Sequence, residues 1–221
     1  MRKIVSVLVV FGFVLFSVNC VTTDNAEQGA LVGAAGGAIV GSLIGNSTGD
    51  AILGAIIGAA IGGAAGAYIG SYMDRQAAEM RQEVPGAEVD RVGEGIRVTF
   101  DVGLFFEGGG FELRPAGCET LAGLAVILNR YPDTHVFIEG PAYVPGRYEP
   151  DVALSERRAR AMADFMGSRN VRADRFTARG YTRTDSGGRS DSTGARLQNK
   201  RVGLAIMAND NLKRTARSHV R

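Results

Sequence analysis

The chain has 221 residues, enough for one ordinary domain and additional segments, since domains usually contain about 100 to 150 residues. Its formal net charge of +2 averages an almost uncharged N-terminal part and a charged remainder, so the composition does not indicate a nucleic-acid-binding surface. With only two cysteines and two histidines, a zinc site of Cys and His ligands would have to recruit all of them from distant positions. We therefore expect no metal, no cofactor and no nucleic-acid partner.

The first residues have the pattern of an export signal. Two basic residues precede an apolar run over residues 4–18, which is too short for an ordinary membrane-spanning helix and is typical of a secretory signal peptide. The run stops at Cys20, in a sequence that resembles the lipobox of bacterial lipoproteins, although Ser17 and Asn19 depart from its usual pattern. The resemblance implies a signal peptide over residues 1–19, lipidation of Cys20 and delivery to the outer membrane. An uncleaved anchor or a cut elsewhere is the alternative.

A glycine at every fourth residue follows a short spacer, residues 20–28. The repeat occurs in residues 29–45 and again in residues 54–70. Each glycine inside a helix costs about 1 kcal/mol relative to alanine, and close approach of helices in lipid would offset that cost. Both runs lack charged residues, and residues 46–50 have the composition of a turn. The pattern predicts a transmembrane helical hairpin over residues 29–73, with membrane lipid as a partner. Its glycine faces can also form a homo-oligomer. A surface-lying Gly/Ala segment is the alternative.

Residues 74–94 are predicted to connect this hairpin to a folded domain. Their first part is charged and helix-permissive, and a Pro-Gly pair at residues 85–86 ends it. Residues 87–91 and 95–100 flank a turn region at residues 92–94, and the alternation of apolar residues in the second segment predicts a half-buried strand. The folded domain is therefore expected to begin near residue 95.

The rest of the chain alternates between strand and helix patterns. The predicted helices cover residues 115–131 and 154–166, and the predicted strands cover residues 135–139, 175–181 and 201–207. This β-α-β-α-β-β order predicts an α+β fold with helices on one face of a mixed sheet. The basic tail, residues 209–221, contains few apolar residues and is predicted to be disordered.

Two sets of motifs resemble known families. The glycine repeat followed by Gly70-Ser71-Tyr72-Met73-Asp74-Arg75-Gln76 resembles OmpA-family outer-membrane lipoproteins of the YiaD type. Residues 95–207 resemble the OmpA C-terminal domain, most clearly at residues 105–107, 112–115, 154–159, 180–181 and 198–202. The resemblance implies an OmpA-like domain over residues 95–208 that lies in the periplasm and binds the peptide stem of peptidoglycan without catalysis.

The resemblance also implies a binding site between the loop after residues 135–139 and the start of the following helix. In the family an aspartate binds the ammonium group of diaminopimelate and an arginine binds its carboxylate, which suits a zwitterionic ligand. Arg158 corresponds to the arginine, whereas Tyr143 stands where the aspartate is expected and Asp151 matches a helix-opening asparagine. The candidate site residues are Arg158, Tyr143, Asp151, Leu154 and Ser155. An ordinary helix-surface arginine is the alternative for Arg158.

Three interpretations of this altered site remain open. Tyr143 stacks on the ligand while Asp151 or Glu149 supplies the charge, or the wall carries a different diamino acid, or the domain has lost wall binding and is a structural or protein-contact module. The leading hypothesis is a non-catalytic tether between the outer membrane and peptidoglycan. Its rival is a glycine-zipper membrane oligomer or assembly protein with a vestigial wall domain. An enzyme is not expected, because the sequence offers no catalytic triad and no phosphate-binding loop.

Overall fold

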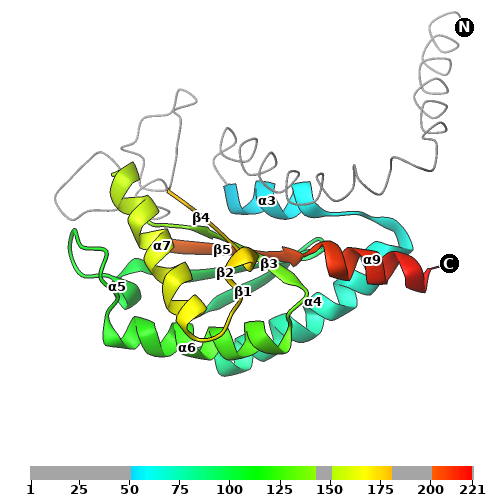
Figure 1. The fold of residues 1–221 in the computed structure, drawn as a ribbon, viewed down its shortest axis with the longest axis horizontal. Coiled ribbons are helices and arrows are strands. Elements are labelled where there is room, and N and C mark those ends of the chain that lie inside the picture. The colour runs from blue at the N-terminus through cyan, green and yellow to red at the C-terminus, as the bar shows by residue number, and fades with distance from the viewer. Residues whose placement is uncertain (1–50, 143–150, 181–200, 221) are drawn as a thin grey trace, which may run out of the picture. The chain divides into compact units, whose positions relative to one another are not determined.

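The computed structural model describes residues 51–142, 151–180 and 201–220 (Figure 1). The helices are α3 (Ala51–Ala59), α4 (Gly63–Glu83), α5 (Val102–Phe105), α6 (Pro115–Arg130), α7 (Val152–Ser168) and α9 (Asp210–His219), with a 3-10 turn η1 (Ala173–Arg175). The strands are β1 (Glu88–Val92), β2 (Gly95–Asp101), β3 (Thr134–Glu139), β4 (Phe176–Arg179) and β5 (Arg201–Ala208). The predicted signal peptide, the lipidation site Cys20 and the first glycine run lie outside the described residues.

The described strands form one mixed sheet in the order β1-β2-β5-β3-β4. Neighbouring strands are antiparallel except β3 and β4, which are parallel. A parallel pair requires a crossover connection, and α7 supplies it between β3 and β4. The α+β class and the mixed sheet predicted from the sequence are confirmed.

One face of the sheet carries the main hydrophobic core, which α4, α6 and α7 cover (Figure 1). The alternation in β2 turns Ile96, Val98 and Phe100 into this core, and all three are at most 2% exposed. On α6, Leu121 and Leu124 lie on one helical face and are fully buried against the same cluster. The apolar periodicity of the sequence therefore identifies the inward faces of these elements correctly.

Helix α4 belongs to this core, although it begins in the second glycine run and continues through the predicted connector. Its side chains Ile69, Met73, Ala77 and Met80 recur at spacings of three and four residues and are 0% exposed. The folded unit thus begins before residue 95, where the sequence pattern placed the start of the domain. The sequence pattern assigned Ile69 and Met73 to a membrane hairpin and Ala77 and Met80 to a connector, but all four pack on the domain itself.

Helix α3 covers the opposite face of the sheet (Figure 1). The residues in this contact are Ile52, Ala55, Ile56 and Ala59 of α3 and Val92, Phe137, Ala205 and Met207 of the strands. Two strand glycines make room for the helix, because a Cβ at Gly95 would lie 2.6 Å from Ile56 Cγ2 and one at Gly203 would lie 3.0 Å from Ile52 Cγ1. The two helices predicted within the OmpA-like domain, α6 and α7, thus lie on one face as expected, whereas α3, predicted as part of a membrane hairpin, covers the other face.

The predicted second arm of the hairpin is not one continuous helix. Helix α3 ends at Ala59, and Gly62 and Gly63 have φ values of 69° and 63°, a conformation that a right-handed helix does not contain. The chain therefore turns at these two glycines, the N-cap and the first residue of α4. None of the helices over the described residues combines the length and the hydrophobicity that a membrane span requires.

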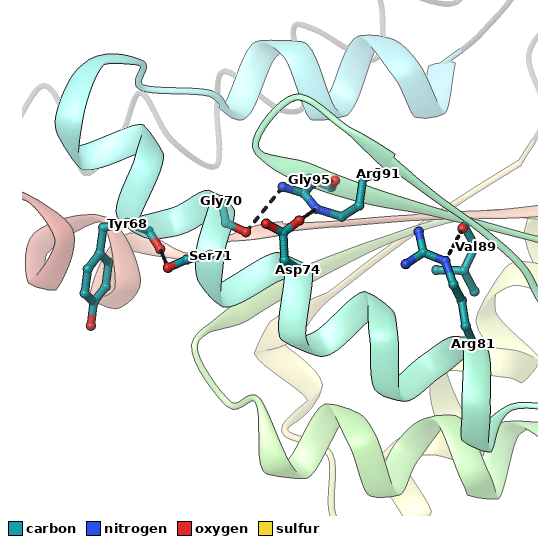
Figure 2. A network of polar contacts seen from close by, with 8 residues as sticks. All are labelled: Tyr68, Gly70, Ser71, Asp74, Arg81, Val89, Arg91 and Gly95. Atoms are coloured by element: carbon teal, nitrogen blue, oxygen red, sulfur yellow. Dashed lines mark hydrogen bonds and ion pairs between the residues drawn. The ribbon is translucent and has the colours of Figure 1, made fainter.

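Polar contacts tie α4 to the β1–β2 hairpin (Figure 2). Arg91 Nε lies 2.7 Å from Asp74 Oδ1, and Arg91 also donates to the backbone oxygens of Gly70 and Gly95. About two helical turns further along α4, Arg81 Nε donates to Val89 O at 3.0 Å. The exposed ion pair adds little stability, but the backbone contacts fix the position of the hairpin on the helix.

The turn of this hairpin also caps the start of α4. The Glu94 carboxylate accepts hydrogen bonds from the backbone nitrogens of Ile61, at 2.8 Å, and of Gly62. A carboxylate at a helix N-terminus is favourable because the first backbone N–H groups have no partner within the helix. The Glu94 carboxylate packs against Gly66, where a Cβ would lie 2.3 Å from Oε1, so a larger residue would have to displace this side chain. At Gly66 the glycine repeat therefore makes room for a charged side chain of the domain.

The C-terminal residues form helix α9, so the prediction of a disordered tail is wrong for residues 210–219. The Asn209 side chain caps the helix by accepting a hydrogen bond from Leu212 N at 3.0 Å. Leu212 and Ala216, four residues apart, are at most 2% exposed and join the main core. The His219 ring lies 4.7 Å from the Tyr68 ring of α4, centroid to centroid. Two well-spaced apolar residues and a cap were sufficient for a helix in a segment of low overall hydrophobicity.

Candidate functional site

The candidate site begins where α7 starts, at Asp151. Its Oδ1 atom accepts a hydrogen bond from Leu154 N at 2.9 Å, which satisfies one of the unpaired backbone donors of the first turn. The backbone nitrogen of Asp151 in turn donates to Ala142 O at 3.3 Å, in the loop that follows β3. Leu154 is 8% exposed and anchors the first turn. The cap therefore fixes both the start of α7 and its distance from this loop.

The end of β3 and the first turn of α7 are in direct backbone contact at Gly140. Ser155 Oγ donates to Gly140 O at 2.7 Å, and the Gly140 nitrogen donates to Arg179 O of β4 at 3.0 Å. A Cβ at residue 140 would lie 1.9 Å from the Ser155 carbonyl oxygen. Only glycine allows this approach, which sets the position of α7 along the edge of the site.

Arg158 lies one turn further along α7 and is 0% exposed. Its guanidinium donates to the carbonyl oxygens of Gly110 from Nε at 2.8 Å, of Gly108 from Nη2 at 2.9 Å and of Pro141 from Nη1 at 3.1 Å. The centre of the guanidinium lies 5.0 Å from the centroid of the Phe106 ring. One side chain thus joins the loop after α5 to the loop after β3.

The charge of Arg158 is kept in this buried position. Burial lowers the pKa of the guanidinium, while the nearby Asp151 carboxylate opposes that shift. An arginine remains protonated in proteins even when its pKa falls, because the pKa in water is so high. The site therefore holds a fixed positive charge, hydrogen-bonded to backbone carbonyls and close to one carboxylate. A guanidinium and a carboxylate at a fixed spacing are the two groups that a zwitterionic ligand requires.

Four of the predicted site residues, Asp151, Leu154, Ser155 and Arg158, are brought together in the first two turns of α7. Tyr143, the fifth, and Glu149, its possible substitute for charge, lie outside the described residues. Sequence reasoning missed the carbonyl groups that hold Arg158 and the aromatic ring beside it. The signals that point to them are the three consecutive glycines at residues 108–110 and the Phe-Phe-Glu motif at residues 105–107.

A second buried arginine, Arg175, stands at the opposite end of β3 and is 6% exposed. It donates to the carbonyl oxygens of Leu128 at 2.7 Å, Thr134 at 2.8 Å and Tyr131 at 2.9 Å. These contacts join α6, β3 and η1, so Arg175 is a structural residue. It borders a cavity of about 520 Å³ between η1 and the start of α9. Because its environment is so similar to that of Arg158, it offers a matched control for experiments on the candidate site.

His135, in the wall of this cavity, is expected to make the free energy of unfolding dependent on pH. Its Nε2 atom lies 2.8 Å from Thr177 Oγ1, and burial, followed by the charge of Arg175, lowers the pKa of the imidazole. The unfolded chain, with a histidine pKa of about 6.5, then binds a proton more readily than the folded chain. The free energy of unfolding should therefore fall as the pH drops below about 6.5. Urea titrations at pH 7.5 and pH 5.5 should show a smaller fall in His135→Gln, and an equal fall in both chains would contradict this assignment.

The mixed sheet, its covering helices and the arginine-centred loops at the end of β3 define an OmpA-like domain. Residues 105–200 match the model of the OmpA family, and residues 1–74 match the model of the YMGG-like Gly-zipper family. The chain thus carries an OmpA-family domain behind a YMGG-like glycine zipper. Both resemblances drawn from the sequence motifs are confirmed.

Related proteins agree with this assignment. The chain is 31% identical over 136 residues to Probable lipoprotein YiaD of Escherichia coli (strain K12), a match that covers 61% of this chain and 62% of that protein. It is 36% identical over 98 residues to the Peptidoglycan-associated lipoprotein of Brucella melitensis, and this match covers 43% of this chain and 58% of that protein. The matches span about three fifths of the length of these relatives. Among solved structures, a MotB-like protein of Desulfovibrio vulgaris superposes with a TM-score of 0.54 at 18% sequence identity. The superposition covers 64% of this chain and 94% of that chain, and it supports the fold.

Proposed function

We propose that the protein is a non-catalytic tether of the bacterial cell envelope, which links the outer membrane to peptidoglycan through its OmpA-like domain. The observation that carries the proposal is the buried, hydrogen-bonded guanidinium of Arg158 at the position of the family's ligand-binding arginine. The names of the relatives, a lipoprotein and a peptidoglycan-associated lipoprotein, support an envelope location. Lipidation of Cys20 would supply the outer-membrane end, with the OmpA-like domain in the periplasm.

Recognition in this proposal relies on charge at a fixed spacing. Arg158 binds a carboxylate of the peptide stem of peptidoglycan, and its carbonyl partners hold the guanidinium in place before the ligand arrives. Asp151 is the described carboxylate that lies close enough to influence the charge of Arg158, so it is the group proposed for the ammonium end of the ligand. Leu154 and Ser155 position the first turn of α7, and Tyr143 stacks on the ligand.

Sedimentation of the full chain with purified peptidoglycan tests this proposal. Arg158→Lys keeps a positive charge but loses the planar fork of donors, so we expect binding to weaken by about 10-fold or more. Arg175→Lys makes the same change in the other buried arginine and should leave binding within about two-fold of the native chain, because it disturbs stability without touching the site. Equal losses in both variants, or unchanged binding in Arg158→Lys, would contradict the role of Arg158.

The rival function rests on Tyr143, which stands where the family has an aspartate. If the native chain does not sediment with peptidoglycan but Tyr143→Asp does, the domain has the family fold without its ligand. The function would then be assigned to the glycine zipper as a membrane oligomer or assembly segment. Saturable binding by the native chain would instead favour the tether and a local substitute for the missing carboxylate.

A further inference from the structure

An uncharged and exposed corner lies where α3 ends and α4 begins. No charged residue occurs between Ala51 and Met73. Within residues 57–67, which we call the apolar corner, Ile57 is 65% exposed, the highest value for a large hydrophobic residue in the described part of the chain. The exposed residues around it are Gly58, Ala60, Gly62, Gly63, Ala64 and Ala67. This surface has no polar side chain to interact with water.

The apolar corner cannot simply turn inward. The opposite side of α3 is already occupied, because Ile52 and Ile56 fill the space above Gly203 and Gly95 on the sheet. The turn into α4 is held by Glu94, whose carboxylate accepts the hydrogen bonds from the backbone at residues 61 and 62. Ile57 is therefore presented outward by a rigid support.

Helix α9 packs along α4 and carries Lys213, Arg214 and Arg217, which we call the basic rim (Figure 1). Lys213 is 4% exposed and interacts electrostatically with Glu94, the residue that caps the corner. The next basic residues on α9, Arg214 and Arg217, are exposed. Neither makes a hydrogen bond or an ion pair with another residue in the part of the chain that the structure describes. Both guanidinium groups are thus available to an anionic partner.

We propose that the apolar corner and the basic rim form a docking site for the surface of a phospholipid bilayer. Ile57 enters the boundary between headgroups and acyl chains, while Arg214 and Arg217 bind phosphate groups of anionic lipids. Interfacial segments bind in this way, by shallow burial of apolar side chains combined with attraction between basic residues and anionic headgroups. The proposed contact uses none of the residues of the candidate site.

The register of the sheet gives this contact a consequence for orientation. Thr134, at the start of β3, pairs with Ala208, directly before α9, whereas Glu139 at the other end of β3 leads into Gly140 of the candidate site. Arg158 and the basic rim therefore lie at opposite ends of β3. A domain that docks on the bilayer through the rim directs its arginine site away from the membrane.

A fluorescent reporter at residue 57 tests the proposal on the full chain. Ile57→Cys and Val126→Cys are each made in a Cys118→Ser background, labelled with the environment-sensitive dye NBD and reconstituted into vesicles of phosphatidylethanolamine and phosphatidylglycerol. Val126 is the matched control, an apolar residue on α6 that is 50% exposed. The background chain without a new cysteine measures any label at Cys20. Quenching is read with a spin label carried on the lipid acyl chains, in the absence of peptidoglycan.

We expect emission from residue 57 to shift to the blue and to be quenched by the spin-labelled lipid, with little quenching at residue 126. Arg214→Glu together with Arg217→Glu should lower the equilibrium constant for docking by about 30-fold, and neutral phosphatidylcholine vesicles should have a similar effect. A blue shift without quenching would mean that protein, such as a second copy of the chain, covers the corner. That result would overturn the proposal. Equal quenching at residues 57 and 126 would also overturn it, and so would quenching that does not change when the two arginines are replaced. None of these fluorescence measurements depends on binding to peptidoglycan.

Discussion

Replacing Gly140 with alanine is expected to lower the free energy of unfolding by about 3 kcal/mol or more. The new Cβ would lie 1.9 Å from Ser155 O, 2.8 Å from Ser155 C and 3.0 Å from Ala159 N. All three atoms belong to the backbone of α7, so no side chain can rotate away. The clash is relieved only if the helix moves away from the end of β3, which would also displace Arg158 from its carbonyl partners.

Gly167→Ala is the matched control, because Gly167 lies in the same helix and a Cβ there would have nothing within 4 Å. This variant should be as stable as the native chain or more stable by up to about 1 kcal/mol, since alanine favours helix. Urea unfolding followed by circular dichroism compares the three chains. A Gly140→Ala chain with native stability would mean that α7 is not held against β3 as described.

The elements of the OmpA-like domain could be predicted because their signals are local. Alternation of Ile96, Val98 and Phe100 is sufficient to identify an inward strand face, and Pro115 and Pro132 mark the limits of α6. Each signal depends on residues within one element. Their sequential order then restricts the ways in which a mixed sheet can be built.

The surroundings of α3 and α4 could not be predicted in the same way. An apolar stripe shows that a helix is buried on one side, but its sequence does not distinguish lipid from a protein sheet as the partner. The decisive residues are distant in sequence: Gly203 makes room for Ile52, and Glu94 caps the turn after Ala59. Such complementary positions become visible only when the chain is folded.

In the candidate site, too, some features could be predicted from the sequence and others could not. The position of Arg158 on α7 follows from helical spacing after Leu154, and the structure brings these two residues together with Asp151 and Ser155. The partners of the guanidinium are backbone carbonyls, which every residue possesses and no sequence pattern identifies. Burial of the arginine was therefore not predictable, although its place in the site was.

A chain that begins at residue 87 is expected not to fold, although it contains the whole of the predicted domain, residues 95–208. It lacks α4, whose side chains Ile69, Met73 and Met80 are all 0% exposed in the main core. Removing one buried isoleucine or methionine side chain costs about 2 to 5 kcal/mol. The loss of all three is comparable to the total stability of a typical domain, about 5 to 15 kcal/mol.

Two longer chains separate the contributions of α3 and α4. A chain that begins at residue 51 keeps both helices and should unfold cooperatively at nearly the temperature of the full chain. One that begins at residue 62 loses only α3, so it should keep the fold but expose Phe137 and Met207, bind a hydrophobic dye and aggregate more readily. Thermal unfolding by circular dichroism and dye fluorescence distinguish the three chains. Cooperative unfolding of the chain that begins at residue 87 would show that α4 is dispensable and that the domain does begin near residue 95. If that chain shows no cooperative unfolding, the end of the glycine zipper is a structural part of the OmpA-like domain.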